Sequence, residues 1–416
     1  MFFLDRPPLL VDIVTFFDKQ NSATKKASTP DMKQALIHNP MYIYLMVLTI
    51  TVSGGLHVWQ TLFDNFAVNV VHLEGHHVGV IQSVREIPGF LSLLVVYVLL
   101  ILKEHRLSAL SVLLLGIGLA ATGMLPSFMG LILTTLVMSF GFHYYETTYQ
   151  SLGLQYFDKS VAPVVFGKLR SYAALSSMVT GGVVFILVMF LSFSQMYVVF
   201  GALVAGVGLW AFTRNPASTD MIPQHKKLIF KKCYWLYYAL TFMAGARRQI
   251  FMAFAVFLLV KKFEYSVQGI AVLFLINNSI NYFLSPFIGK CIVWFGERRM
   301  LSLEYLALIF IFISYALVSS PVAAGVLYVL DHVFFNFAIA LNTFFQKIAD
   351  PRDIAPSMAM GFTINHIAAV VLPAVGGLLW LIDYRIPFIA GAGLSVISLM
   401  LVQCITGQLK AASADA

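Results

Sequence analysis

Charged residues are scarce in this sequence. Of its 416 residues only 11% are Asp, Glu, Lys or Arg, whereas a soluble domain carries about 25%. Hydrophobic residues make up 59% of the chain and its mean hydropathy is +0.84. This composition excludes a soluble enzyme, a nucleic-acid-binding protein and a disordered scaffold. It predicts a protein whose solvent is lipid over most of its length.

Cysteine and catalytic motifs are also scarce. The three cysteines, Cys233, Cys291 and Cys404, have neither metal-ligand nor redox spacing, and they indicate no disulfide framework. The sequence contains no Walker loop, no dinucleotide fingerprint and no nucleophile–base motif. We therefore expect no enzyme activity, no cofactor, no resident metal and no nucleic-acid partner.

Long apolar runs make up most of the sequence. A helix that crosses a bilayer needs about 20 apolar residues, and twelve such runs are present. They fall at about 41–70, 77–102, 107–124, 127–151, 163–191, 195–213, 234–261, 267–294, 300–318, 322–346, 355–382 and 386–405. The pattern predicts an all-α membrane protein with twelve transmembrane helices.

Polar stretches divide the chain. The predicted segments are a tail at 1–40, a six-helix half at 41–213, a linker loop at 214–233, a second six-helix half at 234–405 and a tail at 406–416. Within the first tail, residues 8–18 fit either a short amphipathic helix on the membrane surface or a frayed end.

Basic residues set the predicted orientation, because cytosolic loops carry an excess of Lys and Arg. If the N-terminus is cytosolic, 21 of the 27 basic residues lie on the cytosolic side and three on the other side. That count assigns Lys168 and Arg170 to a cytosolic loop. We expect both termini and the linker in the cytosol, and the protein in the plasma membrane, which in a bacterium is the inner membrane.

An internal repeat and a loop motif point to a family. Ala-Pro, Gly, Ala-Ala and Gly-Gly recur in order at 162–182 and 355–377. The loop at 289–299 reads GKCIVWFGERR. Its Gly289, Gly296, Arg298 and Arg299 resemble the conformational loop signature of the major facilitator superfamily, although Val293 replaces the usual Asp. The resemblance implies two pseudo-repeats of six helices that move substrate by alternating access around a central site.

Polar residues inside the predicted helices are the candidate functional groups, because a charge at the bilayer centre costs about 2.5–3.5 kcal/mol on insertion scales. The predicted substrate-binding residues are His57, Gln60, Arg247, Arg248, Gln249, Asn278, Asn281, Asp331, His332, Asn365 and His366. The predicted proton-coupling or gating residues are Asp64, Arg85, Glu86 and Glu146.

Alternatives stay open for several of these groups. Either Arg247 or Arg248 clamps an anionic substrate, or one of them pairs with Asp331. Glu86 and Glu146 either carry a proton or are held in structural bridges by Arg85 or Arg170.

Three further expectations concern single residues. We expect Asp64 to act in coupling or as a gate. We expect His143, His332 and His366 to join helices by hydrogen bonds rather than to bind metal. Glu304 is expected one turn from a cytosolic helix end, close to Arg298 and Arg299.

The resulting hypothesis is a secondary active transporter, a symporter or an antiporter, that moves a small organic solute with a proton. An anionic solute is the leading case, and the protein is expected to act as a monomer in the lipid bilayer. One alternative is an exporter of lipids or amphipathic drugs, which the 36 Phe and 17 Met residues would suit. The other is a non-transporting receptor or scaffold with the same fold.

Overall fold

The computed structural model describes residues 36, 38–73, 75–217, 224–225, 227–265 and 267–414. The predicted surface helix at 8–18 lies outside the described residues, as does part of the predicted linker. Within the described part of the chain all regular secondary structure is helical.

The first six spans follow the predicted apolar runs. They are α3 (Pro40–Asn69), a second span of α4 (Gly75–Phe90), η1 (Leu91–Leu94) and α5 (Val95–Val98), then α6 (Glu104–Met124), α7 (Phe128–Tyr156), α8 (Ala162–Leu187) and α9 (Phe193–Thr213). Polar caps start several of these helices, because the first backbone N–H groups of a helix lack partners. The side chains of Asn39, Ser127 and Ser192 accept such N–H groups.

The last six spans are equally close to prediction. They are α10 (Trp235–Ile250) with the π-helical turn η3 (Phe251–Ala255) and α11 (Val256–Phe263), then α12 (Val267–Phe295), α13 (Glu297–Leu317), α14 (Pro321–Phe334) with η4 (Phe335–Ala338) and α15 (Ile339–Ile348), α16 (Ile354–Ile382) and α17 (Arg385–Val402). The short helices η2 (Lys232–Tyr234), η5 (Pro351–Asp353) and α18 (Ile405–Ala414) flank them.

These spans confirm the predicted twelve-helix fold. Within the described residues, ten spans are long and apolar enough to cross a membrane. The other two, 235–263 and 354–382, complete the same bundle. Many large apolar side chains point outward, among them Phe185, Phe283 and Phe310, as expected for a surface that faces lipid.

Three spans change their helical geometry near the middle. Pro88 lies inside α4, shortly before the 3-10 turn η1. The π-helical turn η3 follows Arg248 within the seventh span, and the 3-10 turn η4 follows Asp331 within the tenth. Such breaks are frequent at functional sites, and here each lies within a turn or two of a charged residue.

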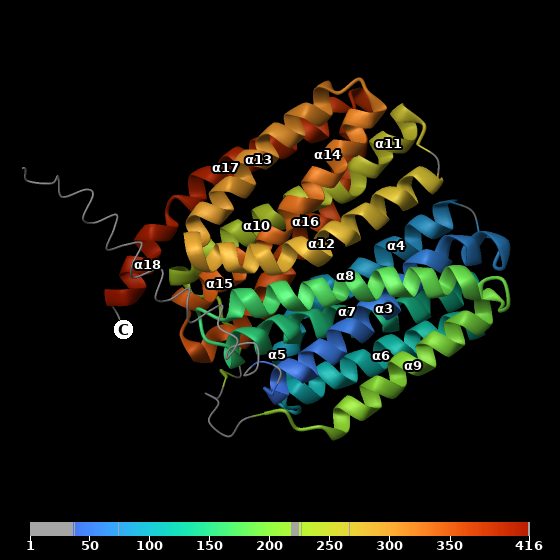
Figure 1. Cartoon of the computed structure of the whole chain (residues 1–416), viewed down its shortest axis with the longest axis horizontal. Helices are drawn as coiled ribbons and strands as arrows, with labels where there is room; N and C mark the ends of the chain where they lie inside the picture. The colour runs from blue at the N-terminus through green and yellow to red at the C-terminus, as the bar shows by residue number, and fades with distance from the viewer. Residues whose placement is uncertain are drawn as a thin grey trace, which may run out of the picture.

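The spans form two groups, an N-terminal half (α3–α9) and a C-terminal half (α10–α18) (Figure 1). The halves meet along two seams. In one seam α8 packs against α12, and in the other α16 packs against α4, η1 and α5. The two helices that carry the sequence repeat, α8 and α16, therefore have matching roles, since each packs against the opposite half.

Small residues allow close approach at the α8–α12 seam. A Cβ added at Gly167 would collide with the backbone oxygen of Ser285, and one added at Gly289 would collide with that of Pro163. Membrane helices commonly associate through such small residues. Gly289 of the loop motif is thus a packing residue in this fold.

The two ends of the bundle differ. We call the end with Pro40, Tyr156 and residues 227–234 the linker end, and the opposite one the far end. At the linker end Gln346 of α15 donates to the backbone oxygens of Leu154 (2.7 Å) and Phe157 (2.8 Å) in the other half. The largest hydrophobic cluster also includes residues of both halves.

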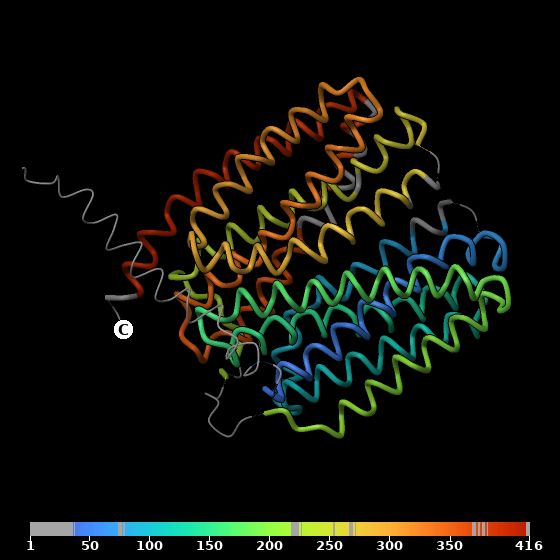
Figure 2. The backbone as a smooth tube through the Cα atoms, in the orientation of Figure 1, coloured from blue at the N-terminus to red at the C-terminus, as the bar shows by residue number. Residues whose placement is uncertain are grey.

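The far end lacks comparable contacts in the described residues. The cluster there, around Phe254, Phe312 and Phe388, belongs to the C-terminal half alone. The two groups of helices diverge toward this end (Figure 2). These hydrogen bonds and the larger cluster therefore join the two halves at the linker end, whereas the cluster at the far end lies within one half.

Candidate functional site

A cavity of about 390 Å³ lies between the two halves. Its wall comes from α3, α7 and α8 of the N-terminal half and from α10, α13–α16 and η4 of the C-terminal half. The charged, histidine and amide side chains on the wall are His143, Glu146, Gln150, Arg170, Arg247, Arg248, Glu304, Asp331, Asn342, Asn365 and His366. Three arginines and three carboxylates thus face one central space.

Arg247 belongs to a buried network within the C-terminal half. It is 3% exposed, and its Nη2 lies 3.7 Å from Oε1 of Glu304 on α13. Its guanidinium lies 4.3 Å from the ring centre of Tyr305 and donates to the hydroxyl of Ser398 on α17. A buried charge that has lost its water needs such partners, so Arg247 acts as an internal tie between three helices.

Asp331 enlarges this network. It is 2% exposed, it interacts electrostatically with Arg247 and Glu304, and among the described residues none forms a hydrogen bond with its Oδ2. Two buried carboxyl groups therefore share one guanidinium. The predicted pairing of an arginine with Asp331 is incomplete, because the carboxylate within 4.0 Å of Arg247 is that of Glu304.

Arg248 and Arg170 are held differently. Both line the cavity, yet no carboxylate of the described residues forms an ion pair within 4.0 Å of either one. Glu146 interacts with both at longer range and accepts a hydrogen bond from Gln150 at 3.3 Å. Both guanidiniums therefore lie on the cavity wall without a close carboxylate, and an anionic group in the cavity could accept hydrogen bonds from them.

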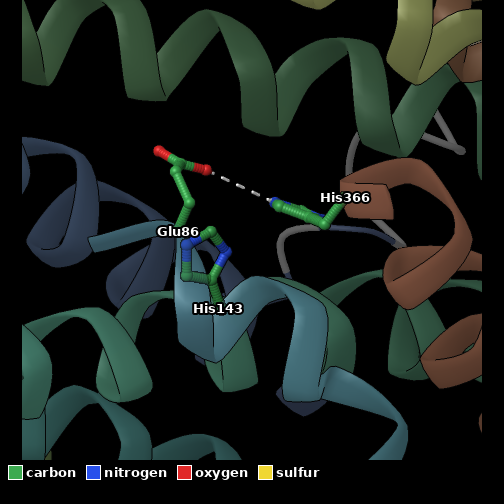
Figure 3. A group of neighbouring side chains, drawn as sticks. All are labelled: Glu86, His143 and His366. Carbon is green, nitrogen blue, oxygen red and sulfur yellow. Dashed lines mark ion pairs between the residues drawn. The ribbon is translucent and has the colours of Figure 1, made fainter. Parts of the chain in front are cut away.

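A third group lies beside the cavity, where α4 and α7 meet α16 (Figure 3). Oε1 of Glu86 accepts from Arg85 at 2.9 Å, and its Oε2 lies 4.0 Å from Nε2 of His366. The rings of His143 and His366 are 4.8 Å apart. Of these residues His143 and His366 line the cavity, whereas Glu86 is not part of its wall.

The cavity brings together six residues that the sequence had singled out: Glu146, Arg247, Arg248, Asp331, Asn365 and His366. The remaining predicted residues lie outside its wall. Gln60 and Asp64 are exposed on α3, farther toward the far end. His57, Gln249 and His332 are partly buried on helices that line the cavity but are not part of its wall.

Two predicted substrate ligands form hydrogen bonds within the protein instead. Asn281 accepts a hydrogen bond from Nδ2 of Asn336 at 2.6 Å, and Asn336 also accepts one from Ser285 at 2.9 Å. Asn278 donates to the backbone oxygen of Phe274 within its own helix. Asn281 and Asn336 are buried and satisfy each other, as buried polar groups generally do.

Two residues of the cavity were misplaced by sequence reasoning. Glu304 was expected one turn from a helix end, close to Arg298 and Arg299. It lies two turns inside α13 and pairs with Arg247. Arg170 does not lie in a loop, because α8 begins at Ala162 and carries Arg170 into the cavity wall. Its position eight residues inside a predicted helix was the signal that could have identified it.

The loop motif has structural roles at the linker end. Gly296 adopts φ +78°, a conformation that favours glycine. Arg298 donates to Gln403 (3.1 Å) and Thr406 (3.0 Å), which ties the start of α13 to the last helices. Arg299 is exposed beside an apolar groove.

The linker docks on the start of α16 through Asp353. This carboxylate is fully buried and accepts from His225 (2.7 Å), Tyr234 (2.7 Å) and Lys231. Burial opposes its negative charge, but the three donors outweigh burial and hold the pKa of Asp353 below its usual value. The same contact raises the pKa of Lys231.

Comparison with solved structures identifies the fold. The structure superposes on FucP, the E. coli fucose:proton symporter, in its outward conformation with a TM-score of 0.70 at 12% identity, over 88% of this chain and 98% of that one. It superposes on a bacterial homologue of the iron transporter ferroportin in the outward-facing state with a TM-score of 0.69 at 12% identity, over 88% and 99% of the two chains.

The human organic anion transporter MFSD10 gives a TM-score of 0.65 at 13% identity, over 90% of this chain and 100% of that one. No protein-family model and no curated protein matches the sequence. The chain therefore has the major facilitator fold, which is that of an integral membrane protein.

Proposed function

We propose that this protein is a secondary active transporter that moves a small organic solute with an anionic group by alternating access, coupled to protons. The observation that carries the proposal is the pair Arg170 and Arg248, from opposite halves, which face one cavity without an ion-pair partner in the described residues. Transporters bind substrate at such a site between their repeats, and guanidinium suits carboxylate or phosphate.

The size and charge of the cavity favour this reading over a drug or lipid exporter. A volume of about 390 Å³ suits a small molecule, and six charged side chains lie on its wall. An amphipathic drug would leave these groups without water or partners. The charged residues of the cavity also disfavour a non-transporting scaffold, because a scaffold does not require charged groups between its two halves.

The proposed direction of opening follows from the contacts between the halves, which lie at the linker end. If the linker end is cytosolic, as the basic residues suggest, the structure is an outward-open state. The fold neighbours FucP and the ferroportin homologue are described in outward states, which agrees with the proposal. A reporter fused after Ala416 should then be active only in the cytosol, and activity on the other side would overturn the orientation.

Glu146 is the proposed proton carrier. It lies on the cavity wall with one amide partner, and its exposure to water must change when the cavity opens and closes. Glu146→Gln keeps the shape of the side chain but removes its titration. We expect gradient-driven accumulation in proteoliposomes to vanish while counterflow exchange of substrate survives.

The substrate for this assay would come from a thermal-shift screen of purified protein against anionic metabolites. Asp158→Asn is the matched control, because Asp158 is an exposed carboxylate outside the cavity, and it should transport normally. Unchanged accumulation in Glu146→Gln would remove Glu146 from the coupling mechanism. Loss of exchange together with accumulation would instead place it in substrate binding.

A further inference from the structure

We propose that Glu86, His143 and His366 form a binding site for a divalent transition-metal ion of the zinc type. Each offers one ligand atom, and the three atoms lie within 4.8 Å of one another. The residues come from three different helices, α4, α7 and α16, and their side chains converge (Figure 3). No spacing in the sequence relates them, since they are 57 and 223 residues apart.

The hydrogen bonds of His366 prepare one of its nitrogens for a metal. Nδ1 lies 2.8 Å from the backbone oxygen of Phe362, and because a carbonyl only accepts, Nδ1 carries the proton. Nε2 is then an unprotonated acceptor, and it is the atom 4.0 Å from Oε2 of Glu86. Metal-binding histidines are typically oriented in this way by a bond to their second nitrogen.

His143 supplies the second imidazole. It is 5% exposed, and among the described residues none forms a hydrogen bond with its Nδ1. A buried polar atom without a partner is costly, and a metal ion would satisfy it. Two imidazoles and one carboxylate are a ligand set that zinc uses in sites with an open fourth position, and here the cavity lies beside the two histidines.

Small side-chain movements would bring the three ligand atoms to the separations of a metal site. Zinc–nitrogen and zinc–oxygen distances of about 2.0–2.1 Å place tetrahedral ligand atoms about 3.3 Å apart. The separation of 4.0 Å between Glu86 and His366 therefore has to shrink by less than 1 Å, and none of the three atom pairs by more than about 1.5 Å. Rotation about side-chain bonds supplies such shifts.

Nearby cations limit the strength of binding. Arg85 is paired with the other oxygen of Glu86, and Arg248 lies within electrostatic reach of both histidines. Glu146 and the ligand Glu86 offset these two charges, so the site as a whole is close to neutral before an ion binds. We expect reversible binding of one ion, weaker than at a structural zinc site with thiolate ligands.

Titration of the purified full-length protein with zinc chloride tests the site. The protein should be stripped with a chelator and purified without a polyhistidine tag. Calorimetry should show one saturable site, and zinc should raise the melting temperature because the ligands join both halves. Glu86→Gln, His143→Gln and His366→Gln should each weaken binding at least about tenfold, since even residues that only orient metal ligands are worth about 10–100-fold.

The control is His332→Gln, another histidine on the helices around the cavity that lies outside this group, and it should bind zinc as the unmodified protein does. Melting curves without metal identify any variant that fails to fold. The absorption spectrum of a cobalt(II) complex reports nitrogen and oxygen ligation independently. Absence of saturable binding, or equal loss in the control, overturns the proposal, and neither result depends on transport activity.

Discussion

Two adjacent arginines on α10 line the cavity but have different surroundings. Arg247 points into the C-terminal half, where Glu304, Tyr305 and Ser398 surround it. Arg248 points toward the seam with the N-terminal half, where its electrostatic neighbours are Glu86, Glu146 and Arg85. Within the described residues the first has a close carboxylate and the second has none within 4.0 Å.

The difference shows how one helix serves both stability and binding. Successive residues on a helix point about 100° apart, so neighbours of identical chemistry enter different environments. Arg247 forms its contacts within the C-terminal half. In the proposed mechanism these contacts remain when the two halves move relative to each other. Arg248, by contrast, keeps no close carboxylate among the described residues and is available to a ligand in the proposed mechanism.

The largest effect should come from breaking the contacts of Arg247. Arg247→Met leaves Glu304 and Asp331 buried without a cation, a loss of about 3–5 kcal/mol of stability. Thermal unfolding in detergent should show a large drop in melting temperature. Arg248→Met is the matched control on the same helix, and it should unfold close to the unmodified protein.

A double variant sharpens this test. Adding Glu304→Gln to Arg247→Met removes one of the two carboxylates left without a cation and should restore part of the lost stability. If the double variant is less stable than the sum of the two single changes predicts, the pair does not stabilise the fold.

A smaller effect, on affinity, is expected from Arg248 and Arg170. Once the thermal-shift screen has identified an anionic ligand, Arg248→Ala should weaken its binding by about 1.5–3 kcal/mol, roughly tenfold or more, the contribution of a hydrogen bond to a charged group. Arg170→Ala should behave in the same way. Normal affinity in both variants would refute the anion clamp. Normal affinity together with a lower melting temperature would show that these arginines stabilise the fold instead.

The smallest effect concerns a paired carboxylate outside the membrane-spanning helices. Asp353→Asn keeps the shape of the side chain but weakens its contacts with Lys231 and His225, at a cost of about 1 kcal/mol. Because the pKa of Asp353 is lowered in the fold, its contribution is present above the pKa of an unfolded Asp, about 3.9, and is lost as pH falls through the lowered value.

Melting temperatures measured from pH 7 down to the acid limit of folding should therefore fall less steeply in Asp353→Asn than in the unmodified protein. Parallel pH profiles would show that Asp353 does not contribute through its charge.

The fold could be predicted from the sequence almost completely. Twelve apolar runs appear as twelve spans within a few residues of their expected ends, because a bilayer demands the same length and polarity from every helix. The Ala-Pro pairs of the repeat lie in the first turns of α8 and α16, where proline costs no hydrogen bond.

The candidate site could be predicted only in part. Periodicity and hydropathy identified Arg247, Arg248 and Asp331, since a charge in an apolar run is visible wherever it points. They could not show that Asn281 bonds to Asn336, because such a contact depends on how two helices face each other. Assigning Arg170 to a loop was wrong for a simpler reason, since basic residues near helix ends resemble loop residues.

The sequence by itself determined the solvent of this protein, the number of its helices and the presence of buried charges, because each of these depends on local composition along one segment. Tertiary structure alone decided which charges are paired. Glu304 meets Arg247, and Glu86 approaches His143 and His366, only where helices distant in the chain pack together. Electrostatic and metal-ligand contacts act over a few ångströms of space, and distance along the chain does not reveal that separation.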